Sequence, residues 1–284
     1  MSSLKYKKIY FDTKYKTADS KSTSDFKVEL PETLSFENNS VFYVDDIAVP
    51  HSWWTVEDFN NKLYVCVYDG ASPGAIPGNT YSHIITLSNG NYTGTDLAAE
   101  ISTKFASVVG GGYSCFYLSK SNTLQIGTTS PTLKFKVLTP NELKTGLNGA
   151  FSLSYDKNKP NDCNEVLSNL EVVSQVCDTL NPFKSGYLNM QPIRNLYLHS
   201  SNLGNYNSIG PDGSQTIIKK IPVTSDYNIM IFDQCVLYND YNDCSHQTIK
   251  TLSFQLKTSR GDVVPLHGVD ISFSIVFSRA SPDV

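Results

Sequence analysis

Short segments in which apolar and polar residues alternate recur along most of the chain, and polar turn residues separate them. A period of two is typical of β-strands, because successive side chains of a strand point to opposite faces. Before residue 80, the segments expected to be strands are 7–11, 25–30, 41–49 and 62–69. After residue 190, they are 193–200, 215–223, 227–238, 249–258 and 269–279. The pattern predicts a mainly β protein.

Residues 81–190 have a different character. A strand and a turn lead into an expected helix, which Thr93 or Thr95 can cap and whose first turn carries Asp96. The apolar residues on one face of this helix are Leu97, Ile101 and Phe105. Further strands are expected at 113–118, 123–127 and 132–138, before a looser region that ends near residue 190. This part is predicted to be a small inserted α+β domain.

The remaining strands number eight when counting starts at 25–30 and the middle part is left out. Eight strands with loops of uneven length are typical of a jelly roll, although a sandwich of another topology would give a similar spacing. We therefore predict a single eight-stranded jelly-roll sandwich with a small inserted α+β domain. The expected boundaries are 1–80 and 191–284 for the jelly roll and 81–190 for the insertion.

Composition limits the class of partner. The chain has 284 residues, a formal net charge of −4 and only 18% charged residues, which argues against a general nucleic-acid-binding protein. The N-terminal region is the exception, because seven lysines outnumber three aspartates there: Lys5, Lys7, Lys8, Lys14, Lys16, Lys21 and Lys27. This basic arm is expected either to be a solvated terminus or to make weak contact with an anionic surface such as a genome.

The only two tryptophans, Trp53 and Trp54, are adjacent and follow Pro50. Proline ends the preceding strand, so the pair is expected in the loop between the second and third jelly-roll strands. Three interpretations remain open: the pair closes one end of the sandwich core, anchors a subunit interface, or forms a carbohydrate platform. We predict that at least one indole packs into the core end or a subunit boundary.

Groups that could carry catalysis are dispersed. The five histidines match no catalytic motif, and His199 and Ser200 are neighbours in a strand, so their side chains point to opposite faces. The segment 239–243 could hold calcium but lacks the spacing of an EF-hand, so a solvated turn is expected. The glycines at 110–112 follow a helix instead of preceding one, which does not suit a phosphate site. We expect no enzyme activity, no cofactor and no metal.

Arg260, Gly261 and Asp262 spell a tripeptide that some viral and extracellular proteins present to cell receptors. A Gly-Asp pair between two strands also serves to turn a hairpin, and this structural interpretation is favoured over a receptor role.

The six cysteines show no metal-ligand spacing, and they are expected to be free thiols in a reducing compartment. The first eleven residues lack the apolar core of a secretory signal, and no apolar run approaches the length needed to span a membrane. We therefore expect no membrane span.

Several blocks, in order along nearly the whole chain, resemble the penton (minor capsid) proteins of virophages, Maverick/Polinton elements and polinton-like viruses. The first blocks are IYFDTKYKTADSKSTSDFKVELPETL, VDDIAVPHSWWTVEDFNNKLYV and ITLSNGNYTGTDLAAEI. The closing blocks are NLYLHSSNL, IIKKIPV and SFQLKTSRGDVVPLHGVDISFSIVF. The sequence departs from the pattern of this group mainly at 139–190.

This resemblance implies a structural capsid protein of the single jelly-roll type. It implies a homo-pentamer at each icosahedral vertex, contact with a double-jelly-roll major capsid protein, a place in the virion assembled inside the host cell, and no catalytic residues. The alternative is an attachment module with the same jelly roll, which binds a glycan or cell receptor through its insertion or loops.

Overall fold

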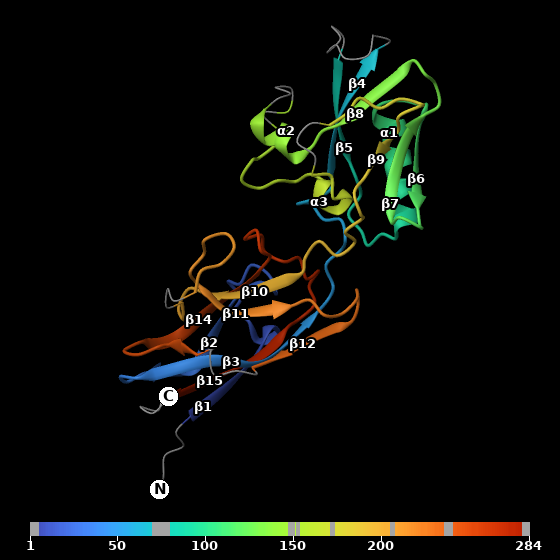
Figure 1. Ribbon diagram of the computed structural model, residues 1–284. Helices are drawn as coiled ribbons and strands as arrows, with labels where there is room; N and C mark the ends of the chain where they lie inside the picture. The colour runs from blue at the N-terminus through green and yellow to red at the C-terminus, as the bar shows by residue number, and fades with distance from the viewer. Residues whose placement is uncertain are drawn as a thin grey trace. The chain divides into compact units, whose positions relative to one another are not determined.

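A computed structural model describes residues 6–69, 80–146, 151, 154–170, 174–204, 208–235 and 241–279. The chain forms two compact units: unit 1 comprises Met1–Trp53 and Ile193–Val284, and unit 2 comprises Trp54–Pro192. Both units are built on antiparallel sheets with few helices, as Figure 1 shows. In the described parts of the chain, no helix is long and apolar enough to cross a membrane.

Unit 1 contains two antiparallel sheets. Sheet A has the strand order β1 (Tyr6–Asp12), β15 (Ser272–Arg279), β3 (Ser40–Pro50) and β12 (Met230–Gln234), and the short β13 (Asn242–Asp243) also pairs with β3. Sheet B has the order β11 (Ile217–Pro222), β10 (Asn195–Ser200), β14 (Thr248–Lys257) and β2 (Asp25–Ser35). A short 3-10 helix, Thr13–Tyr15, follows β1. These strand orders are consistent with a jelly-roll fold.

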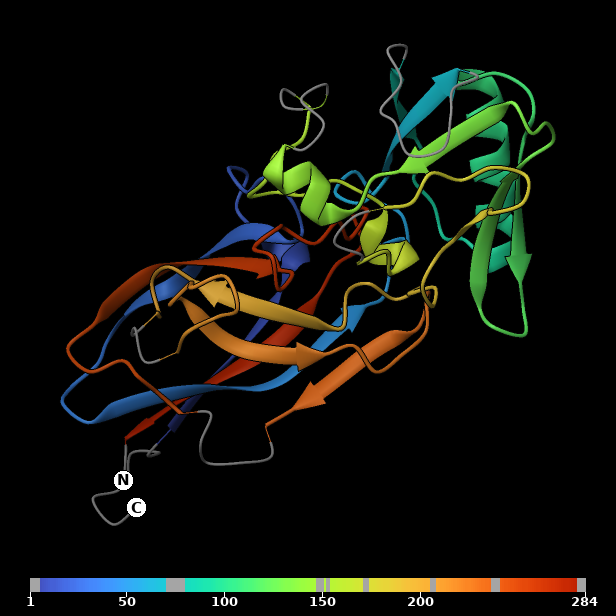
Figure 2. The same cartoon turned by 45° about the horizontal axis from the view of Figure 1, so that its top comes forward.

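Aromatic residues on the inner faces hold the two sheets of unit 1 together. Phe11 of β1 stacks on Phe273 of β15 with ring centroids 4.9 Å apart, and it meets Phe254 of β14 edge-on at 5.3 Å. Phe26 of β2 packs edge-on against Phe273 as well. All four rings are buried. The two sheets lie face to face (Figure 2), and these aromatic rings pack between them.

In its described residues, unit 2 contains two three-stranded sheets and three α-helices. One sheet has the order β5 (Thr80–Thr86), β4 (Lys62–Asp69) and β8 (Leu133–Val137). The other has the order β6 (Tyr113–Leu118), β7 (Thr123–Thr128) and β9 (Phe183–Lys184). The helices are α1 (Gly94–Val108), α2 (Pro140–Thr145) and α3 (Asn164–Leu167).

The helix expected near residue 95 is confirmed as α1. Thr93 is its N-cap and forms a reciprocal capping box with Asp96, which satisfies backbone N–H groups of the first turn. The predicted apolar face, Leu97, Ile101 and Phe105, is fully buried in the larger core of unit 2.

The positions of two strands differ from the expected division of the chain. Segment 62–69 was expected in the jelly roll, but β4 pairs with β5 and β8 in unit 2. Segment 7–11 was left out of the eight, but β1 pairs along its whole length with β15 in unit 1. The first boundary lies between Trp53 and Trp54 instead of near residue 80, whereas the second, between Pro192 and Ile193, lies close to the expected position near residue 190.

The physical reason lies in the two faces of β4. Leu63 and Val65 on one face join the larger core of unit 2, whereas Tyr64 and Cys66 on the other face join a second, smaller core of that unit. A strand that is buried on both faces needs a core on each side of its sheet, and unit 2 provides both of these cores for β4. β4 is also the central strand of its sheet.

Candidate functional site

The first tryptophan lies at a buried corner that follows β3. Trp53 is 2% exposed, and its indole stacks on the imidazole of His51 with ring centroids 4.2 Å apart. His51 Nδ1 lies 2.8 Å from the carbonyl oxygen of Ser225, and the hydroxyl of Ser52 donates to the carbonyl of Leu266 at 3.0 Å. Two loops that are distant in the sequence therefore hold this corner in unit 1.

The second tryptophan begins unit 2 and is partly exposed. The backbone N–H of Trp54 donates to Glu57 Oε1 at 2.9 Å, and the N–H of Glu57 donates to Asn60 Oδ1 at 2.7 Å. The amide of Asn60 donates in turn to the carbonyl of Thr55 at 3.0 Å. This polar turn fixes the backbone after Trp54, and the role of Trp53 and Trp54 at a subunit interface stays a prediction.

Arg260, Gly261 and Asp262 form a tight turn after β14. The N–H of Thr258 donates to the carbonyl of Asp262 at 2.8 Å, and the N–H of Gly261 donates to the carbonyl of Thr258 at 3.1 Å. Gly261 has a φ of +82°, which favours glycine. Arg260 Nε lies 3.7 Å from Asp262 Oδ2, so the two charged groups face each other. This geometry favours the structural interpretation, and a receptor role stays a prediction.

A polar pocket of about 340 Å³ lies in unit 1, on the face of sheet B opposite the aromatic core. Strand alternation produces this face, because Phe254 points into the core while its neighbours Ser253 and Gln255 line the pocket. Four serine or threonine residues contribute to the wall. The other lining residues are Asp19, Lys21, Asp25, Lys27, His199 and Gln255.

His199 is the deepest titratable group of this pocket and is 4% exposed. Its Nδ1 lies 3.0 Å from the hydroxyl oxygen of Thr216. Burial and the positive charge of Lys257 lower the pKa of His199 to about 4, although Asp212 acts in the opposite direction. The imidazole is therefore neutral at pH 7. Ser200 accepts a hydrogen bond from a backbone N–H three residues further on, so the structure does not pair it with His199.

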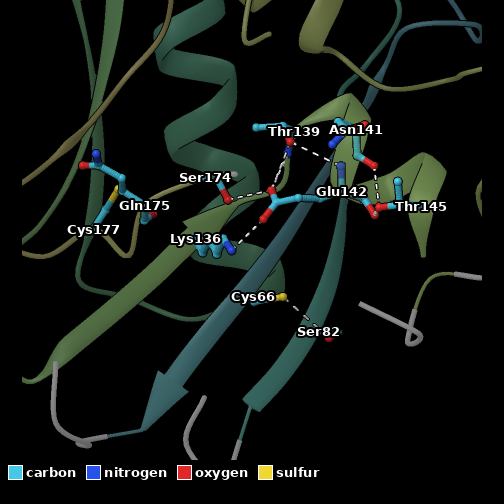
Figure 3. Close-up of polar contacts among 10 residues, drawn as sticks. All are labelled: Cys66, Ser82, Lys136, Thr139, Asn141, Glu142, Thr145, Ser174, Gln175 and Cys177. Atoms are coloured by element: carbon cyan, nitrogen blue, oxygen red, sulfur yellow. Dashed lines mark hydrogen bonds and ion pairs between the residues drawn. The ribbon is translucent and has the colours of Figure 1, made fainter. Parts of the chain in front are cut away.

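Figure 3 shows a buried carboxylate in unit 2. Glu142 Oε1 lies 2.6 Å from Lys136 Nζ, and Oε2 accepts hydrogen bonds from the N–H of Thr139 at 2.9 Å and the hydroxyl of Ser174 at 2.8 Å. Burial raises the pKa of Glu142, but these partners outweigh burial and hold the pKa below its usual value. Both oxygens are engaged, so the carboxylate joins β8, α2 and the segment at Ser174.

The six cysteines are free thiols, as expected. Five of them are buried, and Cys235 is partly exposed. Burial raises the pKa of Cys115 and of Cys244 to about 12, which disfavours the nucleophilic thiolate at neutral pH.

In the part of the chain that the structure describes, no group of three or more His, Cys, Asp or Glu side chains could hold a metal ion. Part of the loop considered for calcium, 239–240, lies outside the described residues. Asp243 Oδ1 accepts hydrogen bonds from the N–H of Ser245 at 2.9 Å and from its hydroxyl at 2.6 Å, which is the arrangement of a turn.

The basic N-terminal run is largely neutralised within unit 1. Four of its lysines form ion pairs with carboxylates: Lys7 with Glu32, Lys8 with Asp45 at 2.5 Å, Lys21 with Asp25 at 3.4 Å, and Lys27 with Asp19 at 2.6 Å. Lys5 lies outside the described residues. Contact of this arm with a genome stays a prediction, and these ion pairs give it no support.

Large apolar side chains are exposed on both edge strands of sheet A. On β1, Tyr6 and Tyr10 are exposed, Tyr10 by 76%. On β12, Met230 and Phe232 are exposed, Phe232 by 72%. These residues were not predicted from the sequence, although alternation within 230–234 places Met230 and Phe232 on one face. The polar pocket was not predicted either, because its lining residues come from segments that are distant in the sequence and share no local signal.

The comparisons with known proteins found similarity in fold only. No protein-family model matches the sequence, and no curated protein matches it. Among solved structures, the fold is similar to the crystal structure of the selenomethionine-labelled mavirus penton protein, with a TM-score of 0.53 and 10% sequence identity. The similarity covers 98% of this chain and 100% of that chain. The chain therefore has a penton-like fold.

Proposed function

We propose that this chain is a minor capsid protein of the penton type, which forms a homo-pentamer at the vertices of an icosahedral particle. The observation that carries the proposal is the fold similarity to the mavirus penton protein, which extends over nearly the full length of both chains. In the particle, the pentamer contacts a double-jelly-roll major capsid protein. The chain acts as a structural protein of the virion and carries out no catalysis.

We further propose that unit 1 is an eight-stranded jelly roll. In chain order, its main strands are β1, β2, β3, β10, β11, β12, β14 and β15, and the two-residue β13 is an additional short strand beside β3. Successive strands alternate between sheet A and sheet B, except that β10 and β11 are neighbours in sheet B. Such repeated crossing between two sheets is typical of a jelly roll. Unit 2 is then an insertion between the third and fourth strands of this sandwich.

The edges of sheet A supply surfaces suited to a ring. A closed ring needs two different, complementary surfaces on each copy, because the contacts are heterologous. The edge strands β1 and β12 lie at opposite ends of the strand order of sheet A, and both carry exposed apolar side chains. Aromatic residues are enriched at interfaces between protein subunits. We propose that these two edges take part in the contacts between neighbouring copies.

The native mass of the purified full chain, measured by light scattering and followed by negative-stain imaging, tests the proposal. A particle of five copies with five-fold symmetry is expected. A strict monomer at high protein concentration would contradict the homo-pentamer.

A further inference from the structure

The polar pocket on the outer face of sheet B is sized and placed for a small ligand. Its volume of about 340 Å³ lies within the range of ligand pockets, which runs from about 300 to 1,000 Å³. Strand residues form its floor, with Gln255 from β14 and His199 from β10. The segment that precedes β2 forms one wall and contributes Asp19 and Lys21.

Backbone hydrogen bonds fix this wall. The N–H of Thr17 donates to the carbonyl of Lys27 at 2.9 Å, and the N–H of Lys21 donates to the carbonyl of Asp25 at 3.0 Å. The hydroxyl oxygen of Ser20 accepts from the N–H of Lys27 at 2.9 Å. The backbone that carries the lining side chains is therefore already ordered before a ligand binds, which lowers the entropic cost of binding.

The charges in the pocket balance. Lys27 Nζ lies 2.6 Å from Asp19 Oδ2, and Lys21 Nζ lies 3.4 Å from Asp25 Oδ2. His199 adds no charge at neutral pH, because burial keeps its imidazole neutral. Two ammonium groups and two carboxylates thus face the same space. A phosphate or another anion would have to approach the carboxylates, so the pocket does not favour a charged ligand.

The lining of the pocket carries both hydrogen-bond donors and hydrogen-bond acceptors. The amide of Gln255 donates to Asp25 Oδ2 at 3.0 Å, which orients that carboxylate. A carboxylate can accept about four hydrogen bonds, an ammonium group can donate three, and a hydroxyl such as that of Ser201 can do both. A ligand complementary to this lining would be uncharged. It would carry hydrogen-bond donors and acceptors close together, as the pocket does.

We propose that this pocket binds a neutral, hydroxyl-rich ligand, namely a monosaccharide unit of a glycan. The inference goes beyond the capsid role and does not depend on the pentamer, because every lining residue belongs to unit 1 of a single chain. In this complex, the hydroxyls of the sugar form hydrogen bonds with Asp25, Lys27 and Gln255.

Saturation-transfer NMR with the full chain tests the proposal, using neutral methyl glycosides of common hexoses and glucose 6-phosphate as an anionic probe. Ser201→Trp fills the pocket from its rim, where Ser201 is exposed. Ser35→Trp is the matched control, because Ser35 is also an exposed serine and lines a different polar pocket of unit 1. Gln255→Ala removes one donor without adding bulk.

At least one neutral glycoside is expected to bind, and glucose 6-phosphate is expected to bind more weakly than its neutral counterpart. Binding is expected to be lost in Ser201→Trp, retained in Ser35→Trp, and weakened about tenfold in Gln255→Ala, which corresponds to one hydrogen bond. No binding of any neutral glycoside, unchanged binding in Ser201→Trp, or a preference for the phosphorylated sugar would each overturn the proposal.

Discussion

His51 and Trp53 stack on each other two residues apart, with 4.2 Å between ring centroids and 28° between ring planes. Tyr227 adds an edge-on contact to His51 at 6.2 Å. The chain turns directly after β3, where the N–H of Ser52 donates to the carbonyl of Pro50 at 2.9 Å, and both rings lie at this corner. This corner ends unit 1, and the next residue, Trp54, begins unit 2.

Replacement of Trp53 by alanine should destabilise the protein by about 3 to 5 kcal/mol, because the change leaves a large cavity at a buried position. Trp54→Ala is the matched control, with an expected loss of about 1 kcal/mol since Trp54 is partly exposed. Urea unfolding followed by far-UV circular dichroism measures both. Equal losses in the two variants would contradict the assignment of Trp53 as a core residue.

Glu142→Gln should destabilise unit 2 by about 3 kcal/mol at pH 7, because it leaves the ammonium of Lys136 without its carboxylate. The folded state lowers the pKa of Glu142, so the ionised carboxylate adds stability above the usual pKa of 4.5. This contribution is lost as the pH falls through the lowered value.

The difference between wild type and Glu142→Gln should therefore shrink below about pH 4.5, which urea unfolding between pH 3 and pH 7 can follow. Glu100→Gln serves as the control, because Glu100 pairs with Lys104 at 3.7 Å near the surface. Its expected loss is below about 1 kcal/mol. A Glu142→Gln variant as stable as Glu100→Gln would show that the buried carboxylate contributes little.

Gly186→Ala should destabilise unit 2 by about 2 kcal/mol. A Cβ atom at Gly186 would lie 2.4 Å from the carbonyl oxygen of Ser168, and a backbone atom cannot move aside as a flexible side chain can. At Gly127, the nearest atom to an added Cβ belongs to Pro182 and is 3.9 Å away, so Gly127→Ala is the control. Thermal unfolding should show a lower melting temperature for Gly186→Ala, and a larger drop for Gly127→Ala would refute this packing.

Phe232→Ser should weaken assembly of the proposed pentamer by at least tenfold, because a large exposed ring on β12 would no longer be available to a neighbouring copy. Phe116→Ser removes an equally aromatic exposed side chain from β6 of unit 2 and should leave assembly unchanged. Light scattering over a dilution series measures the mass of each variant. If both variants assemble like the wild type, the edge of sheet A formed by β12 is not a contact surface.

Local patterns predicted much of the secondary structure. Alternation located β6, β7 and β8 within one or two residues, and the capping residues with the apolar face at Leu97, Ile101 and Phe105 located α1. These signals are local, because the period of the side chains and the cap of a helix depend on residues only a few positions apart. The mainly β character was therefore determined by the sequence alone.

The pairing of the strands was decided only by the tertiary structure. Segments 7–11 and 62–69 have similar alternation, yet β1 joins β15, some 260 residues away in sequence, and β4 joins β5 and β8. Hydrogen bonds between strands are made by the backbone, which is the same in every strand. Alternation of side chains therefore does not determine which strand pairs with which. The polar pocket has the same origin, because only the pairing of β10, β14 and β2 brings His199, Gln255 and Asp25 to one face.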